Sequence, residues 1–212
     1  MKKLNDIKYI TDTDFEGSMA RAFDTDEVYR RMSVENAVFS GDAAGVAFSE
    51  DAFFSCRFEN AIFTNCSFDK CRFVSCDLSG CDLEDAYFNG CVFENCKGVG
   101  TSFCSGVLYD CSFFGCNLSF ANYTKAKLED VEFENCRFAE ASVSECKVKR
   151  MKFSDSDLRG CTFFRTSLTG VDLCDNEISG IILSDNLSEL RGAVISSEQA
   201  EMVAKMLGIK VK

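Results

Sequence analysis

The side chains that could do chemistry in this 212-residue chain are mainly its 14 cysteines, because the sequence contains no histidine. Cysteine thiolates bind soft metals, form disulfides or act as nucleophiles. No Cys-x-x-Cys pair occurs, so the spacing does not indicate a metal site. Twelve cysteines instead recur at multiples of five residues, and we expect them to be reduced thiols that pack as small apolar side chains. Cys104 and Cys174 fall outside this pattern and are expected to face outward.

Other catalytic arrangements find little support in the sequence. The absence of histidine excludes Ser-His-Asp and Cys-His nucleophiles and imidazole general bases. Acidic residues such as Asp82, Glu84 and Asp85 fall on outward positions, where no cleft would raise a carboxyl pKa. The segment 97–101 contains two glycines, but it lacks the Gly-Lys-Ser/Thr ending of a phosphate-binding loop. We therefore expect a protein that is not an enzyme and that uses no metal or cofactor.

The element that must position these side chains is a five-residue repeat. Every fifth residue from Phe48 to Leu183 is apolar, except for Gly98, and the residue two positions earlier is usually small. A helix repeats near 3.6 residues and a strand near 2.0, so a period of five indicates a solenoid. The chain contains no proline, which leaves every backbone amide free to bond a neighbouring coil.

A longer period of 20 residues lies on top of the repeat and predicts four sides per coil. About seven stacked coils then account for residues 48–183 in an all-β fold. The predicted structural core contains the residues that recur at this spacing, namely Phe53, Phe73, Phe93, Phe113, Phe133, Phe153, Cys56, Cys76, Cys96, Cys116 and Cys136. Gly98 is expected to leave its central position in the core empty.

The repeat resembles that of the pentapeptide-repeat proteins, whose consensus places Leu or Phe at the centre and Ala or Cys two residues before it. The match is close in stretches such as Cys66-Ser67-Phe68-Asp69-Lys70-Cys71-Arg72-Phe73. The family's fold is a right-handed quadrilateral β-helix. The resemblance therefore implies a handedness that the spacing alone does not supply.

The two ends of the chain depart from the regular repeat, which predicts three regions. We expect an N-terminal cap and irregular first coil over 1–47, the β-helix over 48–183, and a C-terminal capping and dimerisation module over 184–212. The step from Phe39 to Phe48 is nine residues, so a one-residue shift of register is expected near Gly41 and Gly45.

The C-terminal module is predicted to contain a short α-helix. Ser196-Ser197-Glu198-Gln199 has the form of a capping box, and the helical pattern ends at Gly208. Its apolar residues form a surface wider than one stripe, which fits either a cap on the last coil or a two-fold dimer contact. The predicted dimer interface consists of Met202, Val203, Met206, Leu207 and Ile209.

This module also resembles the C-terminal module of the quinolone-resistance pentapeptide-repeat proteins, the Qnr and MfpA groups, over residues 192–200 and 204–209. The resemblance implies a homodimer of end-to-end rods that binds DNA gyrase and topoisomerase IV as a mimic of duplex DNA and protects them from quinolones. Many Qnr proteins carry loops that interrupt the rod, and this repeat has none. We expect a cytoplasmic protein that binds neither nucleic acid nor membrane, since no signal peptide and no long apolar segment is visible.

The charge gives mixed support to DNA mimicry. The net charge is −11, and residues 48–183 hold 21 acids against 13 bases, whereas duplex DNA of ~34 Å carries about 20 negative charges. The candidate partner-binding acidic surface comprises Asp82, Glu84, Asp85, Glu129, Asp130, Glu132 and Glu134. A basic cluster at Lys147, Lys149, Arg150 and Lys152 should repel a DNA-binding surface. The alternative is therefore a scaffold for a different protein partner, without topoisomerase activity.

Overall fold

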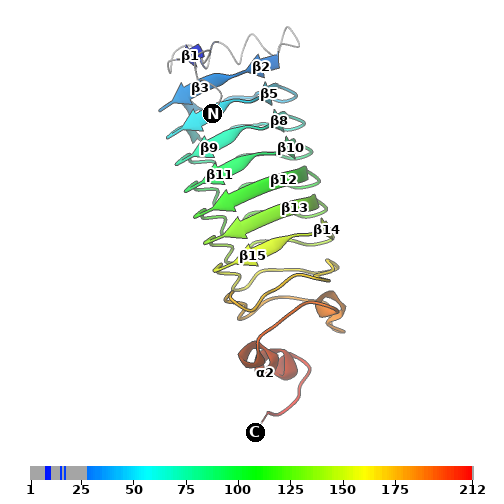
Figure 1. Ribbon diagram of the computed structural model, residues 1–212. Helices are drawn as coiled ribbons and strands as arrows, with labels where there is room; N and C mark the ends of the chain where they lie inside the picture. Colours follow the sequence, from blue (N-terminus) through cyan, green and yellow to red (C-terminus); the bar gives the residue numbers. More distant parts are fainter. Residues whose placement is uncertain (1–7, 11–14, 16, 18–27, 212) are drawn as a thin grey trace.

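The computed structural model describes residues 8–10, 15, 17 and 28–211. Within these residues the chain winds into stacked coils that form a rod, and the helix α2 (Ser197–Met206) lies beyond the last coil (Figure 1). All strand pairs are parallel, because each coil is bonded to the equivalent side of the next coil. The predicted all-β solenoid with four sides and a short C-terminal α-helix is confirmed.

Two of the four faces consist of regular strands. The first face contains β2 (Val28–Arg30), β5 (Ala47–Ser49), β8 (Ser67–Asp69), β10 (Tyr87–Asn89) and β14 (Lys147–Lys149). The second face contains β1 (Lys8–Ile10), β3 (Met32–Glu35), β6 (Ala52–Phe54), β9 (Arg72–Val74), β11 (Val92–Glu94) and β15 (Lys152–Ser154). Two longer strands, β12 (Val107–Phe114) and β13 (Lys127–Glu134), run across both faces.

The other two faces are built mainly from turns. The third face begins with β4 (Val38–Phe39) and β7 (Arg57–Phe58) and continues through single bridges such as Asp77↔Lys97. Bridges such as Asp82↔Ser102 define the fourth face. On both, an Asp or Asn before the central residue accepts the amide N–H two residues later, as in Asp77 with Ser79. These side chains stabilise a turn in place of an extended strand.

The register follows the predicted period of 20 residues over the regular coils. Phe53 pairs with Phe73, and Phe93 pairs with Phe113. The first coil is one residue shorter, because Phe39 pairs with Phe58 while Asp42 already pairs with Ile62. The expected shift of register is confirmed, and the missing residue lies between Phe39 and Asp42.

The last coil is two residues longer than the regular ones. Asp172 pairs with Val194, and the 3-10 helix η1 (Ser188–Leu190) lies in the added segment. Glu189 in this helix is buried and accepts hydrogen bonds from the amides of Arg165 (2.8 Å) and Ser184 (3.3 Å). The buried carboxylate thus satisfies amides that the irregular coil would otherwise leave without partners.

Aromatic rings fill the interior in columns along the rod. Phe93 stacks on Phe73 at a centroid distance of 4.7 Å and on Phe113 at 4.4 Å. Gly98 does not leave its central position empty, because an added Cβ would lie 3.0 Å from Cδ2 of Leu118 in the next coil. That expectation was wrong, since the larger neighbour fills the space.

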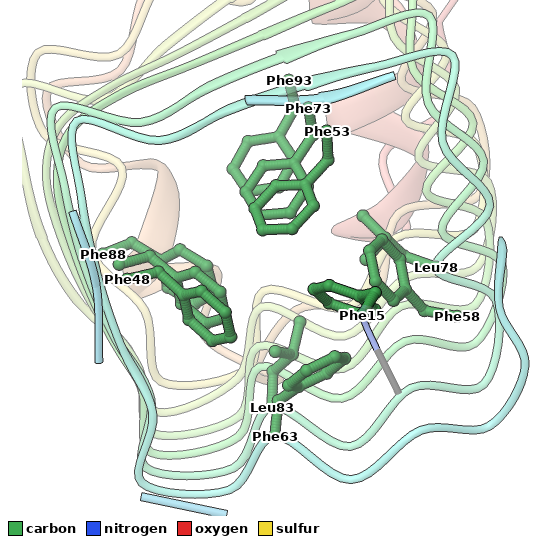
Figure 2. A pocket seen from close by; sticks show the side chains of 11 residues that line it. Phe15, Phe48, Phe53, Phe58, Phe63, Phe73, Leu78, Leu83, Phe88 and Phe93 are labelled. Atoms are coloured by element: carbon green, nitrogen blue, oxygen red, sulfur yellow. The ribbon is translucent and has the colours of Figure 1, made fainter. Parts of the chain in front are cut away.

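Phe15 closes the N-terminal end of this interior (Figure 2). The side chain is fully buried, and its ring packs edge-on against Phe39 at 5.8 Å, Phe53 at 6.1 Å and Phe58 at 6.4 Å. The cavity that remains among these rings holds only about 10 Å³. An apolar cavity of that size stays dry and has no room for a ligand.

The cysteines lie where the repeat predicts them. The twelve on the small inward position are buried, whereas Cys104 and Cys174 are partly exposed. Most of the buried thiols donate to carbonyl oxygens of the preceding coil, as from Cys76 to Phe53 (3.3 Å), whereas those of Cys71 and Cys111 donate within their own coil. Burial raises the pKa of the thiols of Cys66 and Cys81 to about 12. Such thiols remain protonated and unreactive at neutral pH.

Asp51 places a carboxyl group on the inward position that Cys71, Cys91 and Cys111 occupy in later coils of the same face. It is 1% exposed and accepts hydrogen bonds from the amides of Met32 (2.8 Å) and Ser49 (3.1 Å). Burial nevertheless raises its pKa from 3.8 to about 6, although the two amide hydrogen bonds act in the opposite direction. The ionised carboxylate therefore destabilises the first coils above this pH.

Replacing Asp51 with cysteine should change the pH dependence of stability. An unfolded Asp ionises near pH 4 and the folded one near pH 6, so Asp51 should by itself contribute a loss of about 3 kcal/mol of stability as the pH rises through this window. Asp51→Cys should not show this loss. Urea unfolding at pH 4, 6 and 8 measures the change in stability. Cys71→Ala is the control, because it alters the equivalent inward position of the next coil without removing a carboxyl group. Parallel pH profiles for wild type and Asp51→Cys would contradict the prediction.

Candidate partner-binding surfaces

The first predicted acidic group lies on the fourth face, near the N-terminal half of the rod. Oδ1 of Asp82 accepts a hydrogen bond from the amide of Glu84 (3.0 Å), so this carboxylate stabilises its own turn. Glu84 and Asp85 are exposed and form no ion pair with any residue that the structure describes. These two carboxylates are therefore available to a cationic partner.

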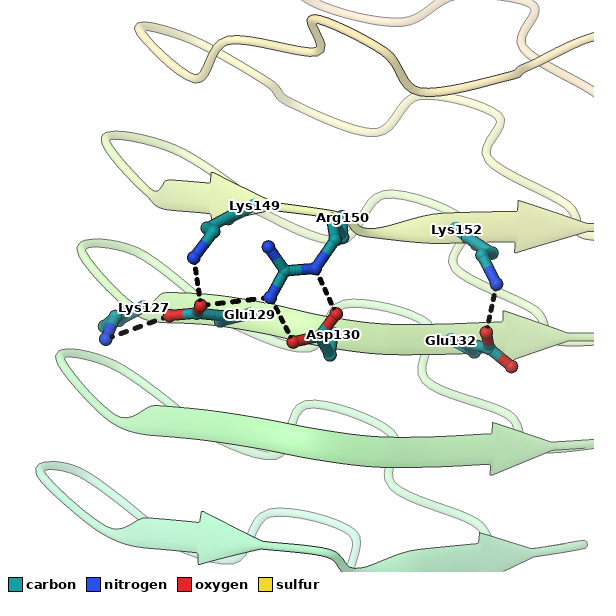
Figure 3. Close-up of polar contacts among 7 residues, drawn as sticks. All are labelled: Lys127, Glu129, Asp130, Glu132, Lys149, Arg150 and Lys152. Atoms are coloured by element: carbon teal, nitrogen blue, oxygen red, sulfur yellow. Dashed lines mark hydrogen bonds and ion pairs between the residues drawn. The ribbon is translucent and has the colours of Figure 1, made fainter.

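The second predicted acidic group lies on β13, and three of its four acids, Glu129, Asp130 and Glu132, are ion-paired with bases of the next coil (Figure 3). Glu129 contacts Lys149 (2.5 Å), Lys127 (3.3 Å) and Arg150 (3.2 Å). The same arginine also pairs with Asp130. We call this set, with Lys152 and its partner Glu132, the ion-pair ladder.

The ladder follows directly from the length of a coil. Residues 20 apart lie side by side, so Lys149, Arg150 and Lys152 fall beside Glu129, Asp130 and Glu132. Hydrogen bonds from Lys149 lower the pKa of Glu129, and hydrogen bonds from Arg150 lower that of Asp130. Because these pairs are exposed to solvent, each contributes little to the stability of the rod. Their main effect is to neutralise the negative surface that the sequence alone suggests at this position.

Three further acids extend the negative surface toward the C-terminal end of the second face. Glu134, Asp155 and Asp175 are exposed and have no ion-pair partner within the described residues. Only Glu134 belongs to the surface predicted from the sequence. The other two occupy equivalent corners 20 residues apart, a relation that could have been found from the coil length.

The C-terminal helix has the predicted capping box. Ser196 accepts the amide of Gln199, while the side chain of Gln199 accepts the amide of Ser196. The same glutamine donates to the carbonyl oxygens of Leu173 (2.7 Å) and Asn176 (2.9 Å) in the last coil. This single side chain thus both begins the helix and fixes it to the rod.

The five residues predicted for a dimer interface divide into two groups. Met202 is partly buried and packs against the core, and Val203 is also partly buried. Met206, Leu207 and Ile209 are 40%, 55% and 52% exposed. The structure therefore leaves an apolar surface uncovered at the end of the rod.

The described residues contain no group of three or more Cys, Asp or Glu side chains that could hold a metal ion. No helix in the described part of the chain is long and apolar enough to span a membrane. What the geometry offers is a rod with separate acidic areas and an apolar end.

In comparisons with known protein families, two models of pentapeptide repeats match the chain. Family models described as "Pentapeptide repeats (9 copies)" and "Pentapeptide repeat region" match residues 53–97 and 107–183. A search of the curated proteins found no match.

Solved structures that are similar to this chain include QnrB1, a plasmid-mediated fluoroquinolone resistance protein, in two forms. A trypsin-treated variant is 25% identical over 96% of this chain and 95% of that one, with a TM-score of 0.49. The full-length form is 24% identical, covers 96% of both chains and has a TM-score of 0.45. HetL, a pentapeptide-repeat protein involved in heterocyst differentiation regulation in the cyanobacterium Nostoc sp. strain PCC 7120, is 15% identical over 85% of this chain and 97% of that one, with a TM-score of 0.43.

Proposed function

We propose, since the chain belongs to the pentapeptide-repeat family, that it is a dimeric, non-enzymatic protein that binds DNA gyrase or topoisomerase IV in the cytoplasm and relieves their inhibition by quinolones. In this proposal the rod takes the place of duplex DNA on the enzyme and does not itself bind nucleic acid.

The C-terminal module is the observation that carries the proposal. Its sequence resembles that of the Qnr and MfpA proteins, and it forms a capped helix that Gln199 holds on the last coil. The exposed apolar side chains of Met206, Leu207 and Ile209 suit an end-to-end contact between two copies. Two rods joined in this way would present one long surface to a DNA-binding enzyme.

The charge distribution limits which parts of the rod would meet a topoisomerase. The ion-pair ladder is close to neutral, so it makes a poor substitute for the phosphates of DNA. We therefore assign the contact to five of the exposed acids that have no ion pair with any described residue, namely Glu84 and Asp85 on the fourth face and Glu134, Asp155 and Asp175 on the second.

A supercoiling assay tests the proposal. Purified gyrase inhibited by ciprofloxacin should regain activity when the protein is added at micromolar concentration. Glu84→Lys combined with Asp85→Lys should weaken this rescue about tenfold or more, because two charges at the contact change sign. Lysine is tolerated at the corner position of Asp85, since Lys70 and Lys125 occupy equivalent corners with positive φ.

Glu140→Lys combined with Glu145→Lys is the matched control, because it makes the same change of charge at exposed corners outside the proposed contact. It should leave the rescue unchanged. The proposal would be ruled out if the wild-type protein neither rescued nor inhibited gyrase or topoisomerase IV.

A scaffold for a different protein partner is the second candidate function. The ion-pair ladder favours it, because a surface that neutralises its own carboxylates has not been shaped to imitate a polyanion. A dimeric protein that has no effect on either topoisomerase would support this alternative.

A further inference from the structure

Two exposed tyrosines lie close together on the first face of the rod. Tyr87 precedes the buried Phe88 in β10, and Tyr109 follows the buried Leu108 in β12, so both tyrosine side chains point outward. They are 43% and 41% exposed. The register pairs Tyr87 with Val107, so the two tyrosines lie on adjacent coils and two positions apart along the face. Together they form one aromatic surface, which we call the tyrosine pair.

The tyrosine pair has no partner among the described residues. Neither hydroxyl group is hydrogen-bonded to them, and neither ring contacts another ring or a cation of this part of the chain. Phe164 provides the contrast, because the guanidinium of Arg165 lies 4.9 Å from the centroid of its ring. That contact is a cation–π interaction, in which the negative face of a ring attracts a cation. Both tyrosine rings are free to make the same contact with a cation from another molecule.

Unpaired carboxylates flank the tyrosine pair. Asp85 occupies the corner two residues before the first tyrosine, and Asp110 occupies the corner directly after the second. Both acids are exposed and form no ion pair with a described residue. Lys127 lies beside this surface on the next coil, but its charge is paired with Glu129. The surface therefore combines two aromatic rings with two negative charges that the described chain does not neutralise.

We infer that this surface binds an arginine-bearing segment of a protein partner. A guanidinium group is planar, so it can stack on a tyrosine ring while its N–H groups donate to a carboxylate beside that ring. A lysine ammonium can pair with the carboxylates, but it has no planar face to stack. Nucleic acid would be repelled by the same carboxylates. A second copy of this chain would bring like charges together in a two-fold contact.

The inference goes beyond the proposed function, because it holds for a topoisomerase or for any other partner that presents arginine. Tyrosine and arginine are among the residues that contribute most of the binding energy in protein interfaces. The acids supply the charge complementarity that directs a basic segment to the rings.

Peptide titration tests the inference. Fluorescein-labelled nona-arginine and nona-lysine carry the same charge at neutral pH, and fluorescence anisotropy at physiological salt measures their affinities for the purified protein. Nona-arginine should bind at least about fivefold more tightly than nona-lysine, because only arginine also stacks on the rings. Tyr87→Ser combined with Tyr109→Ser should remove this difference. Serine is tolerated at both positions, since Ser67 and Ser49 occupy them in earlier coils.

Phe120→Ser combined with Phe164→Ser is the matched control, because it also removes two exposed aromatic rings but lies outside this surface. It should retain the preference for nona-arginine, and circular dichroism checks that both double variants are folded. The inference is overturned if neither peptide binds, if the two bind the wild-type protein equally, or if the preference survives in the tyrosine variant or is lost equally in the control. A preference that depends on the tyrosine pair supports the inference, even in a protein that has no effect on gyrase and so contradicts the proposed function.

Discussion

Replacing Phe15 with alanine is expected to lower the free energy of unfolding by about 3–5 kcal/mol. The ring is fully buried and packs edge-on against three other rings at the N-terminal end of the rod. Its removal would leave a cavity and would forfeit aromatic contacts that are worth about 0.5–1.5 kcal/mol each beyond burial. Urea unfolding followed by circular dichroism measures the change.

The effect of Phe15→Ala should be concentrated at one end of the molecule. Coils of a solenoid contact only their neighbours, so loss of the end plug should speed hydrogen exchange in β3 and β4 far more than in β13. Phe120→Ala is the control, because that ring is 56% exposed and its loss should change stability by no more than about 0.5 kcal/mol. A Phe15→Ala protein within 1 kcal/mol of wild type would show that the plug is not required.

Replacing Met206 and Leu207 together with glutamate is expected to halve the mass measured by light scattering, from twice 23.5 kDa to 23.5 kDa. Burial of two such side chains contributes about 3–6 kcal/mol, so their loss should weaken the proposed dimer more than 100-fold. Both are exposed in the single chain, so the helix itself should be retained. Circular dichroism checks that it is.

Phe120→Glu is the matched control for this double variant, since it places an acid on an exposed aromatic far from the C-terminal module. It should leave the mass unchanged. If the Met206 and Leu207 variant kept the mass of the wild type, the module would be only a cap on the last coil.

The repeat could be predicted from the sequence because each central side chain is buried by the same geometry in every coil. The difference between strand faces and turn faces was not predicted, although its signal lies one residue before the centre. Asp77, Asp82 and Asn117 occupy that position on the turn faces, whereas Arg72 and Val92 occupy it on the second face. Short acceptor side chains favour the turn, and longer or β-branched ones favour the strand.

The ion-pair ladder was missed for a different reason. Along the chain its acids and bases form two separate clusters of opposite charge, and only the coil length of 20 residues places Lys149 beside Glu129. Phe15, in contrast, carries no signal that could have been found. It lies outside the period, and only the three-dimensional path of the chain brings it to the rings of Phe39 and Phe53.

Because each coil has four sides, the number of residues in the rod determines how the C-terminal module is rotated about the rod axis. An insertion or deletion of 20 residues would change the rod by one coil, about 4.8 Å, and leave every face aligned with the module. A change of five residues would instead turn everything that follows by a quarter of a revolution about the rod axis. Variation in length by five residues can therefore rotate the proposed partner-binding acids relative to the two-fold axis, but it also stacks a strand face on a turn face, whereas variation by 20 residues does neither.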